Sequence, residues 1–165
     1  MQACADYVKQ TFGRCDILIN NAAINYDTWQ QTLNANLDEV LDTINVNTMG
    51  AWRMINTFVP LMKINNEGRI VNVSSGGGSL ASQNGNTPAY SISKLALNGV
   101  TLQVAHELKG TNIVINSLCP GWVRTDMGGH HANRSVEQAA EDIYWLAQQH
   151  HLNGQFIRDK REIAW

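Results

Sequence analysis

Apolar positions along this 165-residue chain follow two alternating patterns. In some segments they recur every three or four residues, which predicts helices, and in others they form short unbroken runs, which predict strands buried on both faces. This order is typical of an α/β fold whose parallel sheet is covered by helices. We predict strands at residues 16–20, 70–74, 113–118 and 155–157, and helices at 2–12, 37–62, 88–109 and 135–149. No repeat or linker is visible, so residues 1–165 are expected to form one domain.

Turn-forming residues mark the ends of these elements. Gly13 is expected to close the first helix and Gly110 the third. Thr87 and Pro88 are a good helix start, with the threonine hydroxyl as the cap and proline at the first helical position. Pro60 lies in the last turns of the second helix, which we expect it to kink or end.

The helix that begins at Pro88 is apolar on two faces. One stripe is formed by Ile92, Leu95, Gly99 and Leu102, and the other by Leu97, Val100, Val104 and Leu108. One face fits the sheet, and the other needs a second partner. Two segments, 24–34 and 76–87, are polar or rich in glycine and are predicted to be loops.

Composition narrows the possible partners. A net charge of −2 and a pI near 6.2 give no electrostatic reason to expect nucleic acid or an anionic membrane. Neither a signal peptide nor an apolar run of membrane length is visible, and the three cysteines lack a C-x-x-C spacing, so free thiols in a reducing cytoplasm are expected. The pairs His130-His131 and His150-His151 have no cysteine or carboxylate cluster beside them, and we expect no metal site.

Tyr90 and Lys94 are four residues apart in a predicted helix, and that spacing places both side chains on one helix face. A fixed ammonium about 5 Å from a phenol favours the phenolate by roughly 3 kcal/mol at an effective dielectric of about 20, so the pKa of Tyr90 should fall by about two units. Proton exchange near neutral pH then becomes possible. Taken alone, the spacing also fits an exposed helix pair without function.

Four further motifs accompany this pair. They are Asn20-Asn21-Ala22-Ala23, Asn47-Thr48-Met49-Gly50, Ser74-Ser75 and Pro120-Gly121. With the tyrosine and lysine they closely resemble, in order, the N-N-A-G, N-x-x-G, S-S, Y-x-x-x-K and P-G motifs of the short-chain dehydrogenase/reductase family, over nearly the whole chain. The resemblance implies a Rossmann-like doubly wound parallel sheet. It also implies an oxidoreductase that interconverts a secondary alcohol and a carbonyl by hydride transfer.

The resemblance assigns the general acid and base to Tyr90, and a second hydrogen bond on the carbonyl oxygen to Ser75. Ketone reduction builds charge on that oxygen, so both groups need to be in place beforehand. The two residues are slightly farther apart than is usual in the family, which indicates an insertion in the Gly-rich loop. Ser74 is the alternative, although strand alternation would turn it the other way. Either serine could instead simply cap its strand.

Lys94 is implied to lower the pKa of the tyrosine and to donate to the hydroxyls of the nicotinamide ribose. Asn47 is implied to help hold, through its backbone carbonyl, a water that links the lysine to a proton relay. A polar residue inside an apolar helix is a reason to look for function, although the amide could instead bond neighbouring backbone. Asn45 is weaker, because only Asn47 stands three residues before Gly50.

Other residues are implied to bind the cofactor near strand ends, where open α/β sheets collect ligands. With both residues of the Tyr/Lys pair, they are Asn20, Ala22, Ala23, Pro120, Gly121, Val123 and Thr125. Asn20 would also stabilise the central strands, and Ala23 replaces the family's usual glycine, which could narrow the approach of the adenosine moiety. Residues 126–133 are expected to form a mobile substrate lid.

The cofactor is expected to be NAD(P), with a slight preference for NADP. The strand, Gly-rich turn and helix start that receive a dinucleotide's pyrophosphate have no match in the sequence. Residues 1–12 resemble instead the helix before the family's fourth strand, so we expect an N-terminally truncated member that keeps the C-terminal part of the fold.

The expected partners are a small carbonyl or alcohol substrate and further copies of the chain. Long helices pair across a dimer interface in the family, which implies a homodimer or homotetramer. A catalytically inactive remnant that only oligomerises is the rival interpretation. An epimerase or dehydratase is the alternative among enzymes.

Overall fold

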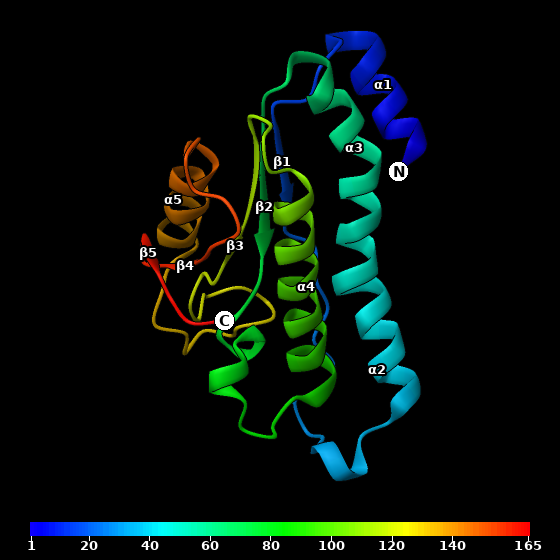
Figure 1. Ribbon diagram of the computed structural model, residues 1–165. Coiled ribbons are helices and arrows are strands. Elements are labelled where there is room, and N and C mark those ends of the chain that lie inside the picture. Colours follow the sequence, from blue (N-terminus) through cyan, green and yellow to red (C-terminus); the bar gives the residue numbers. More distant parts are fainter.

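The computed structural model describes residues 1–165 and contains one five-stranded sheet (Figure 1). In spatial order, the strands are β1 (Ile17–Asn20), β2 (Gly68–Val73), β3 (Ile113–Leu118), β4 (Phe156–Arg158) and β5 (Arg161–Glu162). The first four are parallel, as predicted, and β5 is antiparallel to β4. β5 was not predicted, because two exposed charged residues carry no strand pattern.

Five α-helices cover the sheet in two layers. They are α1 (Gln2–Phe12), α2 (Leu37–Ile44), α3 (Ala51–Asn65), α4 (Pro88–Glu107) and α5 (Val136–Ala147). α3 and α4 lie on one face and α5 on the other, while α1 packs against α3 (Figure 1). This is the doubly wound α/β fold predicted from the sequence. No helix has both the length and the apolar content needed to cross a membrane.

Alternate residues of the central strands face the two helical layers. On β2, Ile70 packs in the core beneath α3 and α4, whereas Val71 packs with Leu146 of α5. β1 differs, because α5 does not reach it: Ile17 and Ile19 are 42% and 43% exposed. The sheet is therefore buried on both faces at β2 and β3, and on one face at β1.

The long helix predicted at 37–62 is present, but it is not regular throughout. α2 continues into a single π-helical turn, Asn45–Gly50, before α3 begins. Pro60 does not end the helix, since α3 runs on to Asn65 and is closed by Asn66 in a left-handed conformation (φ 48°). π-helical turns occur frequently at functional sites, and this one contains Asn47.

α4 begins at Pro88 as predicted, but Thr87 does not cap it. An N-cap residue usually has an extended backbone, whereas Thr87 is left-handed (φ 45°) and makes no capping hydrogen bond. Instead, the carboxylate of Asp27 accepts from the backbone N–H of Ala89 at 2.6 Å. A residue 62 positions earlier therefore caps the helix that carries Tyr90.

Candidate active site

The predicted site residues gather at one edge of the sheet. Asn20 ends β1, Ser74 and Ser75 follow β2 directly, and Pro120 lies two residues after β3. Because these strands are parallel neighbours, their carboxyl ends lie together. α4 begins at the same end of the molecule (Figure 1).

α4 presents a polar stripe to the end of β2. Tyr90, Lys94 and Asn98 are four residues apart and so share one helix face. Lys94 Nζ donates to the carbonyl oxygen of Val73 at 2.7 Å, and Asn98 Nδ2 donates to that of Gly78 at 2.9 Å. The stripe therefore holds both the end of β2 and the glycine run after it.

Ser75 and Tyr90 lie together in the structure. Burial raises the pKa of Tyr90, and hydrogen bonding with the Ser75 side chain opposes that rise. The predicted decrease in this pKa is therefore wrong for the chain alone. Lys94 Nζ lies 5.6 Å from the centre of the Tyr90 ring, and removal of the phenol from water outweighs any help from this ammonium. The phenol consequently stays protonated at neutral pH.

Lys94 is a buried cation, 2% exposed, and no carboxylate lies within ion-pair distance of it. Burial lowers the pKa of Lys94 to about 8. An ammonium carries three N–H donors, and the bond to Val73 uses one of them. The other donors are free to bind hydroxyl groups of a ligand.

The two adjacent serines point in different directions. Ser74 Oγ is buried without a hydrogen-bond partner and lies beside Gly78. Ser75 Oγ accepts from the N–H of Gly77 at 3.2 Å and reaches Tyr90. The geometry thus favours Ser75 as the partner of the phenol.

Asn47 is held in the π-helical turn by its side chain. Its amide accepts from Ile24 N at 2.8 Å and donates to Ile24 O and Ser93 Oγ, both at 2.9 Å. Ser93 Oγ donates to the carbonyl oxygen of Tyr90 at 2.7 Å. This amide therefore ties the chain after β1 to the first turns of α4, whereas Asn45 is exposed.

A row of buried polar groups crosses the sheet beneath α4. Asn20 Nδ2 donates to Asn72 Oδ1 at 2.8 Å, and Asn72 Nδ2 donates to Thr101 Oγ1 at 2.9 Å. Thr101 Oγ1 and Ser117 Oγ are 2.8 Å apart. Asn20 thereby joins β1 to β2, while its part in cofactor binding stays a prediction.

Arg134 fixes the turn after β3. Its guanidinium donates to the carbonyl oxygen of Pro120 at 2.9 Å and pairs with Asp142 at 2.6 Å and Asp159 at 3.0 Å. Gly121 has φ 76°, and a Cβ there would lie 2.7 Å from Arg134 Cδ. Glycine is therefore needed here both for the backbone conformation and for space.

The remaining predicted cofactor residues lie in more exposed chain. Ala22 and Ala23 follow β1, Val123 forms a β-bridge with Arg134, and Thr125 Oγ1 accepts from the N–H of Gly128 at 3.1 Å. The predicted lid lies in the loop that this bridge closes. None of these four residues forms a hydrogen bond with Tyr90 or Lys94, and their roles in cofactor binding stay predictions.

Sequence reasoning missed four residues around the site: Asp27, Asn98, Cys119 and Arg134. Asp27 is 1% exposed, but one aspartate in a polar loop gives no signal. Asn98 does give one, because it follows Lys94 by four residues in a helix with a buried face. Cys119 is close enough to Tyr90 to add to the rise in its pKa.

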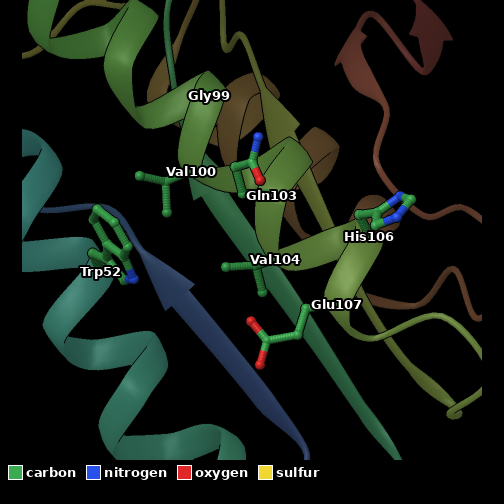
Figure 2. A pocket seen from close by; sticks show the side chains of 7 residues that line it. All are labelled: Trp52, Gly99, Val100, Gln103, Val104, His106 and Glu107. Atoms are coloured by element: carbon green, nitrogen blue, oxygen red, sulfur yellow. The ribbon is translucent and has the colours of Figure 1, made fainter.

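A separate groove of about 670 Å³ lies between α3 and α4. Figure 2 shows Trp52 of α3 and Val100 and Val104 of α4 pointing into it. No predicted site residue lines this groove, so it is distinct from the candidate active site. The chain contains no group of three His, Cys, Asp or Glu side chains placed to hold a metal ion.

Comparison with known proteins agrees with the fold. The model of the family described as short chain dehydrogenase matches residues 1–135. The chain belongs to this family. By family it is therefore an oxidoreductase of the short-chain dehydrogenase type.

Individual relatives show how much of the family's length the chain spans. Carbonyl reductase [NADPH] 1 of Sus scrofa is 29% identical over 215 residues, with 100% of the chain and 72% of the relative covered. Oxidoreductase UcpA of Salmonella typhimurium is 34% identical over 151 residues, with 87% and 53% covered. The structure of carbonyl reductase Sniffer of D. melanogaster is similar with a TM-score of 0.92 at 27% identity, covering 99% of the chain and 73% of Sniffer.

Proposed function

We propose that this chain carries the catalytic part of an NADP-dependent reductase that converts a small carbonyl compound to its secondary alcohol. The observation that carries the proposal is the meeting of Ser75, Tyr90 and the buried Lys94 at the carboxyl edge of the sheet. Similarity to a carbonyl reductase named for NADPH supports both the reaction and the cofactor.

The donor groups of the site fit a nicotinamide cofactor. Lys94 has unused N–H donors that suit ribose hydroxyls, and it stands beside the proton donor. The residues that would hold the cofactor are Asn20, Ala22, Ala23, Tyr90, Lys94, Pro120, Gly121, Val123 and Thr125. A bound nicotinamide supplies the hydride for reduction and accepts it for oxidation.

Residues of the chain donate the proton and stabilise the charge that develops during the reaction. Tyr90, protonated because burial raises its pKa, donates its proton to the substrate oxygen as negative charge builds there. Ser75 donates a second hydrogen bond to the same oxygen. The ammonium of Lys94 stabilises the phenolate that remains, and Asn47 holds the turn of α4 that carries Tyr90 through Ser93.

Replacement of Tyr90 by phenylalanine tests the assignment. Tyr90→Phe keeps the ring and removes the proton donor, so kcat should fall by at least about 10²-fold while NADPH binding is largely kept. Tyr144→Phe is the matched control, because Tyr144 is 64% exposed on α5. The assay follows NADPH oxidation with a panel of carbonyl compounds, in the complete polypeptide that the gene encodes. Near-normal turnover by Tyr90→Phe would remove the basis of the proposal.

Lys94→Ala should weaken both cofactor binding and turnover, because the same ammonium serves the phenol and the ribose. The rival interpretation, an inactive remnant, requires that NADPH cause no thermal stabilisation of the unsubstituted protein, since a bound ligand stabilises by RT ln(1 + [L]/Kd). A rise in Tm with NADPH concentration would therefore exclude the remnant.

We also propose that the chain forms a homodimer or homotetramer through α3 and α4. Exposed apolar side chains lie on these helices, with Trp52 at 42%, Ile92 at 44% and Leu102 at 41%. Trp52 also lines the groove between the helices. Trp52→Glu should lower the mass measured by light scattering, whereas Tyr144→Glu on α5 should not. Unchanged mass in both variants would argue against this interface.

A further inference from the structure

The run Gly76-Gly77-Gly78 forms one 3₁₀ turn directly after Ser75. At Gly78 this turn touches the backbone of α4. A Cβ there would lie 3.0 Å from the carbonyl carbon and oxygen of Lys94 and 2.8 Å from Ser74 Oγ. Since two of these three atoms are helix backbone, they cannot move aside alone, and glycine is what permits the close approach.

Asn98 completes this contact one turn farther along α4. Its side chain is 2% exposed, and Nδ2 donates to the carbonyl oxygen of Gly78 at 2.9 Å. The N–H of Gly78 donates to the carbonyl oxygen of Ser75 at 2.9 Å, and the N–H of Gly77 to Ser75 Oγ at 3.2 Å. Two hydrogen bonds through Gly78 therefore connect Asn98 to the backbone of Ser75, and Gly77, the residue covalently before Gly78, bonds the Ser75 hydroxyl.

We propose that Asn98 is a positioning residue that, with Gly78, holds Ser75 against Tyr90. Three successive glycines have no side chains to restrict their backbone, so the restraint has to come from outside the turn. Gln83 Nε2 donates to the carbonyl oxygens of Gly77 and Ser79 from the loop side, and the buried amide of Asn98 holds Gly78 from α4. Because α4 also carries Tyr90, the Asn98 contact fixes the turn relative to the helix that positions the phenol. The catalytic consequence rests on the proposed function, whereas the physical restraint does not.

Asn98→Leu is the main variant, because leucine branches at the same carbon, has no donor and adds no charge beside Lys94. Gly78→Ala is a second, independent variant that pushes the turn away from α4. The matched controls are Asn56→Leu on the exposed side of α3 and Gly99→Ala on α4, where a Cβ meets no atom within 4 Å.

Amide hydrogen exchange in the 165-residue chain tests the restraint without any need for turnover. Exchange at Gly78 and Ser79, whose N–H groups bond within this turn, should be about tenfold faster in Asn98→Leu, with the centre of α4 and β2 unchanged. Gly78→Ala should do the same at Ser79, and the controls should not. Unchanged exchange in both variants would overturn the proposal, whatever the protein catalyses.

A double-mutant cycle in the complete polypeptide tests whether Asn98 acts through Ser75. Misplacing a reacting group by about 1 Å can cost about 10²-fold, so Asn98→Leu should lower kcat by about 10-fold to 10²-fold with the KM for NADPH unchanged. In a Ser75→Ala background the same substitution should have almost no further effect. An equal loss in both backgrounds would show that Asn98 acts independently of Ser75, and would refute the positioning role even if exchange behaves as expected.

Discussion

Replacing Lys94 by methionine should change the pH dependence of folding stability. Lys94 is 2% exposed and has no carboxylate partner, and burial lowers its pKa from 10.5 to about 8. The difference between these pKa values corresponds to about 3 kcal/mol against the charged side chain in the folded state. At neutral pH the folded chain therefore holds a charged ammonium beside Tyr90 at the expense of stability.

The sign follows from proton binding in the two states. Between about pH 8 and pH 10.5 the unfolded chain still holds the lysine proton that the folded chain has released, so this residue makes the protein more stable as pH rises. Integrating the difference in bound protons over pH shows how much Lys94 lowers the free energy of unfolding. The reduction is about 3 kcal/mol at pH 7 and about 1 kcal/mol at pH 9.5.

Urea unfolding of the native protein and Lys94→Met at both pH values measures this change. Methionine leaves the carbonyl of Val73 without its donor, a loss of about 1 to 3 kcal/mol that is the same at both pH values. The free energy of unfolding of Lys94→Met, measured relative to that of the unsubstituted protein, should therefore be about 2 kcal/mol lower at pH 9.5 than at pH 7. Lys63→Met, at an exposed position, should show no such change. A difference independent of pH for Lys94→Met would refute the reasoning.

Two further substitutions test how the site is held. Asp27→Ala should lower the free energy of unfolding by roughly 1 to 2 kcal/mol because α4 loses its cap, whereas Asp27→Asn retains an acceptor for Ala89 N and should lose less; equal losses in urea unfolding would contradict the capping role. Gly121→Ala should lower Tm more than Gly13→Ala. Both glycines have positive φ (76° and 71°), but only at Gly121 would the added methyl group clash with a neighbour, the side chain of Arg134. Similar shifts in Tm by calorimetry would show that Arg134 moves aside without cost.

Much of the fold could be predicted because local patterns and tertiary packing agree. α1 has its predicted bounds and ends at Gly13 as expected, and β3 matches its prediction residue for residue. The failures occur where distant contacts decide local structure. Thr87 has the residue type of a cap, yet Asp27 takes that role from another part of the chain.

The same division applies to the site. Spacing along one helix places Tyr90 and Lys94 on one face, and strand alternation distinguishes Ser75 from Ser74, because helical and strand periods are local properties of the chain. Asn47 could be selected by its motif, but the Ile24 and Ser93 bonds that hold it depend on how α2 and α4 pack.

The sequence by itself determined the order of the long helices and the four parallel strands, and the identity of the residues at the carboxyl edge of the sheet, since each depends on the period of apolar positions or on a short motif. Only the tertiary structure decided the electrostatics. The pKa of Tyr90 was expected to fall from its distance to Lys94 alone, and it rises because packing removes the phenol from water. The same packing buries Lys94 and lowers its pKa. Desolvation depends on all the atoms that surround a group in the folded state, and the spacing of residues along the chain does not reveal them.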